Sequence, residues 1–203
     1  MKNILVFICL TLVLTACAGI GGPSVPTNFY VLKTSDNLTP PKGLVSLDTG
    51  LNVGIGPVQI PGYADRAQIV TFGTGSEITV ADLDHWAEPL GDAIKRVLSG
   101  NVASLIGETR VFSYPADFRP DKQSIQIAVE IIDVAQLDNG EAYLSARWHV
   151  RRLFDNTVVL RSANTYKASS VAGNYDSYAD ALSGLLGRLA EDMAASLEKA
   201  KTS

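Results

Sequence analysis

Three successive segments in the C-terminal half of the chain are strand candidates, and they constrain the fold more than any other feature. Apolar and polar side chains alternate through 124–131 and 142–150, and 157–168 is the third candidate. A period of two places every second side chain on the same face of a β-strand. Asp138-Asn139-Gly140 and Asp155-Asn156 supply turn residues between the segments. We therefore predict an antiparallel meander of three strands.

Two other segments have the period of an amphipathic helix. The C-terminal one covers about 176–200, with an inner face formed by Leu182, Leu185, Leu186, Leu189, Met193 and Leu197. The earlier one is predicted from about Asp84, with Pro89 in its first turn, where the missing N–H costs nothing. Ser99-Gly100-Asn101 should weaken this helix near its end. Its apolar face comprises Leu90, Ile94, Val97, Leu98, Val102 and Leu105.

These elements predict an α+β fold of the wider α/β class. Further strand candidates lie at 28–32, 51–61, 67–72 and 77–81. A chain of 203 residues can bury one good core but is short for two. We expect one domain, 28–203, built as a two-layer sandwich in which a largely antiparallel sheet carries both long helices on one face.

The N-terminus is typical of a secreted protein. Lys2 precedes an apolar run from Ile4 to Leu14, which is shorter than the about 20 residues that cross a bilayer. Leu14-Thr15-Ala16-Cys17 follows, and a cysteine directly after small residues resembles the lipobox of bacterial lipoproteins. We therefore expect a lipoprotein signal peptide over 1–16, with Cys17 as the first mature residue. A plain secretory signal beside a chance cysteine is the alternative.

Cysteine usage favours lipidation of Cys17. The chain has two cysteines, and Cys9 leaves with the signal peptide, so the mature chain cannot form an internal disulfide. A lone thiol in an oxidising compartment is a liability unless something consumes it, and a diacylglycerol with an N-acyl chain does so while anchoring the protein. Residues 17–27 then form a lipidated cysteine with a Gly/Pro/Ser tether, and by resemblance to enterobacterial lipoproteins Ala18 indicates the outer membrane.

Charge and motifs argue against several classes of function. A formal net charge of -4 without a basic run argues against nucleic acid as a partner. Two histidines and no free thiol in the mature chain argue against a metal site, and no G-x-S-x-G motif is present. The glycine pairs in 54–56 and 73–75 lack the other residues of a phosphate cradle, so we expect turns or close backbone approaches there. We predict no catalytic residue and no cofactor besides the lipid on Cys17.

The segment 84–90, DHWAEPL, allows three interpretations. As chemistry, His85 and Glu88 face each other at a helix start and act as an acid–base pair, although no third group accompanies them. As structure, Asp84 caps the helix and Trp86 packs on the sheet, with Pro89 and Leu90 completing the anchor. As recognition, the exposed His85 and Glu88 contact a partner. We favour structure, with recognition second.

Several longer segments together resemble one family. They are VGIGPVQIPGYADRAQIV at 53–70, HWAEPL at 85–90, ARW at 146–148 and YADALSGLLGRLAEDMAASL at 178–197, downstream of the lipobox. The chain resembles the PqiC-type ABC-transport auxiliary lipoproteins, which are associated with MCE (mammalian cell entry) lipid transporters. The segments 61–66 and 86–90 are the most specific for the family. Ala64 and Ala67 depart from its pattern, which usually has Leu and Pro there.

This resemblance implies a non-enzymatic outer-membrane lipoprotein that faces the periplasm. Such proteins assemble as a homo-oligomeric ring that receives the end of a tube-like MCE-domain protein, through which phospholipids or other hydrophobic molecules pass. Candidate partner-binding residues are Tyr63, Asp65 and Arg66, in a loop bounded by Pro and Gly, together with His85 and Glu88. The structural alternative for the loop is that Arg66 pairs with a local carboxylate and Tyr63 covers the sheet edge.

Two other functions stay open from the sequence. One is a lipoprotein that binds a different periplasmic partner, such as a cell-wall synthase. The other is a small hydrolase, which would need a catalytic site that the sequence does not show.

Overall fold

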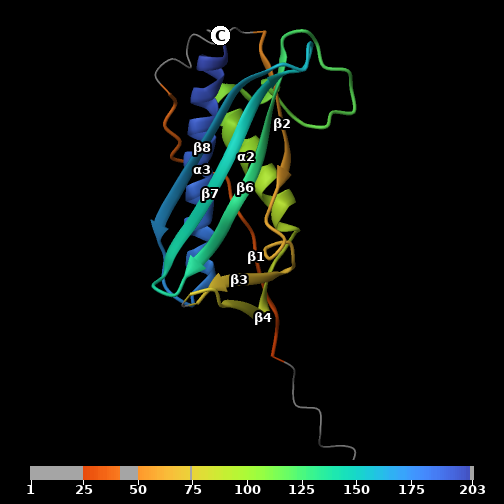
Figure 1. Cartoon of the computed structure of the whole chain (residues 1–203). Helices are drawn as coiled ribbons and strands as arrows, with labels where there is room; N and C mark the ends of the chain where they lie inside the picture. The colour runs from red at the N-terminus through yellow and green to blue at the C-terminus, as the bar shows by residue number, and fades with distance from the viewer. Residues whose placement is uncertain (1–24, 42–49, 74, 202–203) are drawn as a thin grey trace, which may run out of the picture.

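The protein is built as two layers, an eight-stranded sheet and two helices that lie together on one of its faces (Figure 1). The computed structural model describes residues 25–41, 50–73 and 75–201, so Cys17, the predicted signal peptide and most of the predicted tether lie outside the described residues. The predicted α+β sandwich is confirmed. In chain order the elements are β1 (Asn28–Tyr30), β2 (Asn52–Gln59), β3 (Gln68–Phe72), β4 (Ile78–Trp86), α2 (Leu90–Ile106), the 3-10 turn η2 (Glu108–Arg110), β5 (Val111–Ser113), β6 (Ser124–Leu137), β7 (Glu141–Arg152), β8 (Val158–Ser169) and α3 (Tyr175–Lys201).

The predicted meander is present as β6, β7 and β8, which pair antiparallel along most of their length. Gly140, in the turn after β6, has a φ of +81°, a conformation that suits glycine. In the second turn the Thr157 N–H donates to the Asp155 carboxylate at 3.0 Å. Both expected turns are therefore confirmed. The inward face is apolar as predicted, with Ile127, Leu144 and Val150 fully buried.

β6 joins the two halves of the sheet. One edge of β6 pairs with β7, while its other edge pairs with β2 in the first half and with β3 at the end. The pairings of β6 with β2 and β3 are parallel, as are β1 with β4 and β2 with β5. Because parallel neighbours need a crossover, the α2 segment between β2 and β6 accounts for the principal parallel pair. Alternation alone does not reveal strand direction, so the sequence indicated only the antiparallel meander.

The start of the first helix differs from the prediction. α2 begins at Leu90 rather than near Asp84, and Asp84 belongs to β4. Pro89 is the residue before the helix, and its ring disfavours helical geometry at the preceding residue. The strand therefore continues through Trp86, and only residues after Pro89 enter the helix.

Asp84 therefore does not cap α2, and its carboxylate has a different role. Its carboxylate accepts hydrogen bonds from the Asn28 side-chain amide at 2.9 Å and from the Tyr30 hydroxyl at 2.7 Å. Burial of the Tyr30 hydroxyl, followed by the hydrogen bond to Asp84, raises the pKa of Tyr30 to about 12. These bonds tie β1, the first strand after the tether, to β4.

Both helices contact the sheet through the predicted apolar faces. α2 contacts β2 and β5, whereas α3 contacts β7 and β8, and the two helices contact each other. The Trp148 indole N–H donates to the Ser196 hydroxyl of α3 at 3.0 Å and thereby fixes the helix on the meander. The six residues predicted for the inner face of α3 are all buried.

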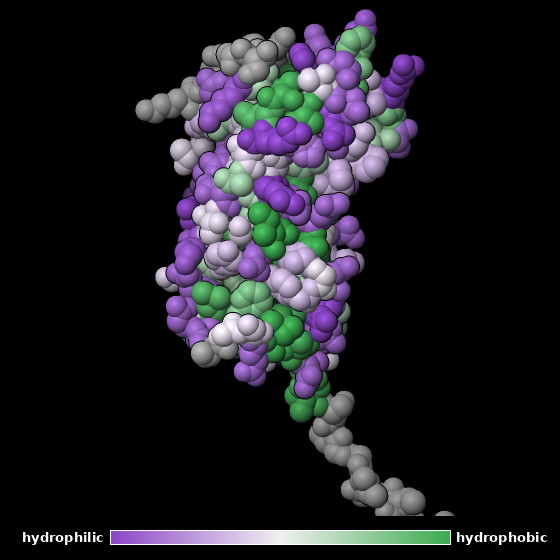
Figure 2. Space-filling view, in the orientation of Figure 1, coloured by the Kyte–Doolittle hydropathy of each residue, from purple (hydrophilic) through white to green (hydrophobic). Residues whose placement is uncertain are grey.

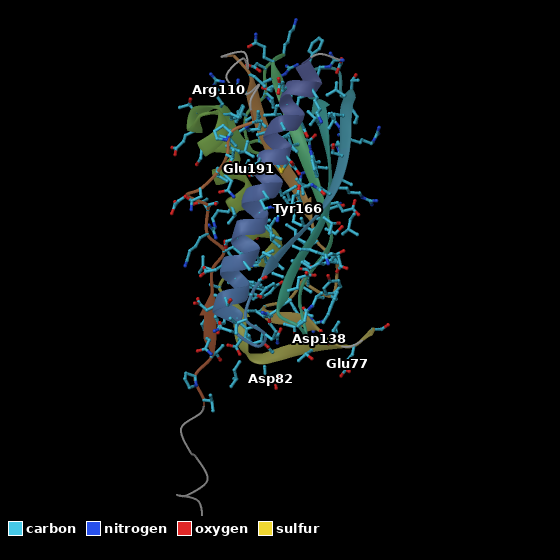
Figure 3. All side chains as sticks on the ribbon, turned by 90° about the vertical axis from the view of Figure 1, so that its left-hand side faces the viewer. Glu77, Asp82, Arg110, Asp138, Tyr166 and Glu191 are labelled. Carbon is cyan, nitrogen blue, oxygen red and sulfur yellow. The ribbon has the colours of Figure 1, made fainter. Side chains whose placement is uncertain are left out.

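The segment 31–39 runs across both helices, alongside α3 (Figure 3). The Ser35 N–H donates to the buried Asn101 amide oxygen at 2.8 Å. A Cβ on Gly100 would lie 2.6 Å from the Thr34 methyl group, so the glycine gives room for this crossing. The Gly100-Asn101 pair, which we expected to weaken α2, therefore serves to attach the N-terminal segment, and α2 continues to Ile106.

The glycines of β2 allow a close strand approach. A Cβ on Gly54 would lie 2.7 Å from the Phe112 ring of β5. Gly56 has a φ of +120°, and a Cβ there would lie 2.5 Å from the Tyr114 carbonyl oxygen. Of the two explanations expected for the glycines at 54–56, a turn or a close backbone approach, the close approach is confirmed.

Candidate docking surface

The two sequence segments most specific for the resemblance meet at one place in the fold. The connection between β2 and β3 lies against the junction of β4 and α2, where the backbone N–H of Trp86 donates to the Ala67 carbonyl oxygen at 2.7 Å. Ala64 is buried in the hydrophobic core that also contains Trp86 and Leu90. We call the combined region, residues 60–67 with 86–92, the corner.

Trp86 is a side chain of the corner that packs into the hydrophobic core. Its indole is only 5% exposed and packs on the buried Tyr178 ring of α3, with centroids 5.9 Å apart. Leu90 is also buried, whereas Pro89 is exposed and lies directly before the first residue of α2. The anchor thus connects the sheet, α2 and α3.

Tyr63 has a structural role that the sequence did not reveal. A bulge in β6 interrupts the register between Ile131 and Asp133. The Tyr63 hydroxyl accepts a hydrogen bond from the Val134 N–H at 2.9 Å and donates to the Asp133 carboxylate. Burial, followed by this bond to Asp133, raises the pKa of Tyr63 far above its ordinary value. Tyr63 therefore satisfies polar groups at the bulge.

Replacing Tyr63 by phenylalanine should destabilise the fold because it leaves the Val134 N–H and the Asp133 carboxylate without this partner. We expect the free energy of unfolding to fall by about 1–3 kcal/mol, measured by urea denaturation. Tyr143→Phe is the matched control, because no hydrogen bond joins the Tyr143 hydroxyl to another described residue. Equal stability of the two variants would contradict the role assigned to the hydroxyl.

Asp65 and Arg66 are the exposed members of the loop. Neither side chain forms a hydrogen bond or an ion pair with another residue of the described ranges. The local carboxylate that would have explained Arg66 is therefore not found among those residues. Two unpaired opposite charges at the tip of an anchored loop are available to a partner.

His85 and Glu88 do not form the pair that the catalytic interpretation required. His85 lies on β4, where its Nε2 is 3.2 Å from the Asp82 carbonyl oxygen and its ring meets Phe29 edge-on. The Glu88 carboxylate instead pairs with Arg96 of α2. Arg96 also donates to the Leu32 carbonyl oxygen at 2.9 Å, so the pair attaches the N-terminal segment to α2. Both residues thus have internal partners, which leaves less of each side chain for docking.

A hollow of about 660 Å³ lies beside the loop. Asp65 of the loop and Asp92 in the first turn of α2 place two carboxylates at this hollow. Ile132, 46% exposed, is an apolar residue at an outward position of β6. Neither Asp92 nor Ile132 was expected at the candidate site from the sequence. The successive isoleucines at 131 and 132 were a usable signal, because one of two neighbours in a strand must face outward. The apolar lining is contributed chiefly by Ile60, Pro61, Pro89 and Ile132.

The side chains of the corner and its hollow are suited to binding a partner protein. No cluster of three or more His, Cys, Asp or Glu residues that could hold a metal ion occurs in the described part of the chain. None of the helices in that part is long and apolar enough to cross a membrane. Apolar side chains beside unpaired charges are the elements from which protein interfaces are built.

Solved structures share the fold. An uncharacterised protein superposes with a TM-score of 0.68 at 13% identity, covering 85% of this chain and 99% of the other. Protein XCC0632 from Xanthomonas campestris superposes with a TM-score of 0.70 at 14% identity, covering 86% and 98% of the two chains. At such identities the likeness shows the fold alone. No curated protein matches the sequence significantly.

The family model described as the ABC-type transport auxiliary lipoprotein component matches residues 30–194. This match includes both helices up to the last turns of α3, the whole meander and the corner. The chain therefore belongs to the ABC-type transport auxiliary lipoprotein family.

Proposed function

We propose that the protein is the docking subunit of an MCE-type intermembrane lipid transport system, anchored through Cys17 in the outer membrane and facing the periplasm. The family supports a role beside a transporter. The lipobox and Ala18 support the anchor and its membrane. The proposal includes a homo-oligomeric ring that receives an MCE-domain protein and lets phospholipid pass, which follows from the resemblance of the segments 61–66 and 86–90.

The position of the tether orients the domain in this proposal. The described chain begins at Val25, at the end where the β3–β4 hairpin lies (Figure 1). Glu77, Asp82 and Asp138 mark the same end (Figure 3). Cys17 precedes Val25 by eight residues, a stretch that extends to at most about 28 Å. The lipid therefore holds this end near the membrane, while the turn between β7 and β8 points into the periplasm.

The observation that carries the docking role is the unpaired state of Asp65 and Arg66. Trp86 and Tyr63 hold the loop in place from two sides, so its tip is presented on a rigid support. A pre-organised loop binds with less loss of conformational entropy than a mobile one. Charged side chains that lack partners among the described residues then lie beside a hollow with apolar side chains in its lining, and together they offer both orientation and contact area.

Arg66→Ala combined with Asp65→Asn should weaken capture of the MCE partner by at least about tenfold, the effect of losing about 1.4 kcal/mol of binding free energy. The measurement is copurification of the tagged, full-length lipoprotein with its membrane partners, quantified against the wild type. The melting temperature should change little, because both side chains are exposed.

Lys33→Ala is the control, since Lys33 is an exposed cation on the helix side, and its one ion pair within the described ranges, with Asp180, is a loose one at 3.6 Å. Light scattering of each variant separates loss of self-assembly from loss of partner capture. If the Asp65/Arg66 double variant copurifies as much partner as the wild type, the protein does not dock through this loop. If Lys33→Ala loses as much partner as the double variant, the effect is not specific to the loop.

A further inference from the structure

The outer face of the meander carries one group of cations that lacks acidic partners. Figure 2 shows this face, on which polar side chains surround smaller apolar areas. Elsewhere on the face each cation is matched: Arg147 pairs with Glu130 at 2.6 Å, and Lys167 with Glu141 at 2.7 Å. Like charges on neighbouring strands repel, so an unmatched group is costly to maintain.

The unmatched cations are Arg151 and Arg161, and the His149 ring lies beside both of them. His149 of β7 lies directly opposite Arg161 of β8 in the strand register. The Arg161 guanidinium is exposed and has no hydrogen bond or ion pair with another described residue. The Arg151 Nε is buried and has no hydrogen-bond partner among the described residues, and the same holds for the Gln126 amide oxygen opposite Arg151. Three neighbouring polar groups thus have unused hydrogen-bonding capacity.

The surroundings of His149 favour a neutral imidazole ring that can donate a hydrogen bond from Nδ1. An arginine can only donate, so at 3.2 Å the Arg151 Nη2 donates to the His149 Nε2. The neutral ring then carries its proton on Nδ1. Burial first, and then the charges of Arg151 and Arg161, lower the pKa of His149 and favour this neutral ring. An incoming anion would thus meet an imidazole N–H beside the Arg161 guanidinium.

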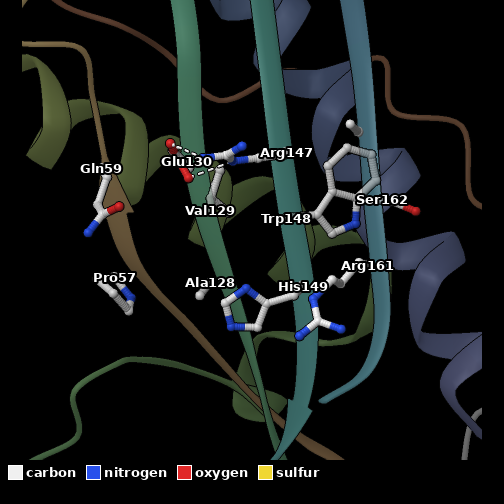
Figure 4. Close-up of a pocket in the computed structure, with 11 residues that line it drawn as sticks. Pro57, Gln59, Ala128, Val129, Glu130, Arg147, Trp148, His149, Arg161 and Ser162 are labelled. Atoms are coloured by element: carbon white, nitrogen blue, oxygen red, sulfur yellow. Dashed lines mark hydrogen bonds and ion pairs between the residues drawn. The ribbon is translucent and has the colours of Figure 1, made fainter.

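His149 and Arg161 border a hollow of about 610 Å³. In Figure 4 the His149 ring and the Arg161 guanidinium lie side by side on adjacent strands, apart from the Arg147–Glu130 pair. Small side chains, Ala128 and Ala163, leave the space above the strands open, and Pro57 of β2 adds an apolar wall. The hollow is far larger than an inorganic anion needs, and part of its lining is apolar.

We propose that this hollow binds an organic phosphate, whose phosphoryl oxygens accept hydrogen bonds from the Arg161 guanidinium and the His149 Nδ1–H while its organic part lies over Ala128, Ala163 and Pro57. Guanidinium groups match the fork of phosphoryl oxygens, and charge-assisted bonds of this kind are strong. A phospholipid headgroup and a soluble phosphate ester share this chemistry. The hollow shares Gln59 and Glu130 with the hollow beside the corner, but His149 and Arg161 lie outside the corner, and the proposal does not depend on the docking role.

The test uses the full-length protein in a non-ionic detergent and titrates it calorimetrically with glycerol 1-phosphate and, separately, with mixed micelles containing phosphatidylglycerol. Arg161→Gln should weaken binding by at least about tenfold, the effect expected for losing one charge-assisted contact. His149→Ala should weaken binding as well. Lys167→Gln removes the same charge from the same sheet face at a matched pair and should bind like the wild type. Arg161 is exposed, so far-UV circular dichroism of Arg161→Gln should equal that of the wild type.

Arg161-dependent binding of both probes supports a phosphoryl site open to soluble esters, and binding of the micelles alone supports a headgroup site. Absence of Arg161-dependent binding with both probes overturns the proposal. An equal loss in Lys167→Gln overturns it too, because the attraction would then be unspecific. A change of oligomeric size in Arg161→Gln with unaltered phosphate binding assigns the cations to a contact between copies and also overturns it.

Discussion

Replacing Trp86 by alanine is expected to lower the free energy of unfolding by about 3–5 kcal/mol, the usual cost of truncating a buried large aromatic side chain. Trp86 is 5% exposed and connects β4 to the Tyr178 ring of α3. Its loss opens a cavity where the sheet, α2 and α3 meet, so the loop that presents Asp65 and Arg66 loses its support as well. Because domains are stabilised by roughly 5–15 kcal/mol in total, the melting temperature should fall sharply and every function should fail together.

Phe29→Ala is the matched control for this prediction. Phe29 lies on the neighbouring strand β1 but is 64% exposed, so its truncation should change stability little. Chemical denaturation of both variants gives the comparison. Similar unfolding midpoints for the two variants would show that Trp86 does not anchor the corner.

Replacing Cys17 by serine should detach the protein from the membrane completely. Each buried methylene of an acyl chain contributes about 0.8 kcal/mol to anchoring, and a diacylglycerol with an N-acyl chain supplies enough of them for stable attachment. Serine lacks the thiol that receives the diacylglycerol. Palmitate labelling should vanish, and the protein should move from the outer-membrane fraction to the soluble fraction.

Cys9→Ser provides the control, because the same atom is exchanged inside the predicted signal peptide, which is removed. It should leave labelling and fractionation unaltered. Unchanged membrane partitioning of Cys17→Ser, together with a wild type that incorporates no palmitate, would refute lipidation at this residue.

The meander and α3 could be predicted because the spacing of apolar residues within each segment is enough to identify the segment as a strand or a helix. In β7 the more buried and less buried side chains alternate, and in α3 the buried leucines recur at helical spacing. The parallel partners of β6 gave no such signal, because pairing between β2 and β6 depends on the path of the chain through α2. Long-range topology of this kind is not encoded in any single segment.

The start of α2 was predicted too early for a local reason. Asp84 has the chemistry of a helix cap, and Trp86 has the spacing of the helix face. Pro89 decided the boundary, since it disfavours helical geometry at the residue before it. The same error placed His85 and Glu88 on one helix face, where they would have met. On the actual strand and turn they have separate partners.

The sequence indicated which two motifs to consider for docking, but it did not indicate the contacts that each of their residues makes. Both motifs of the corner were selected, and the structure brings them together. That Tyr63 serves a β6 bulge 70 residues away could not be foreseen, because a bulge depends on the register between strands. Arg66 could have been paired or free on sequence alone, and only the fold shows that it lacks a partner among the described residues.

Photocrosslinking in living cells tests the docking role most directly. A photoreactive phenylalanine analogue at position 66 reports what lies within reach of the loop tip, and the same analogue at position 180, on the exposed side of α3, is the reference. The account predicts a crosslink from position 66 to an MCE-domain protein, or to a neighbouring copy already bound to one, and none from position 180. Equal crosslinking from both positions, or capture of unrelated proteins alone from position 66, would contradict it.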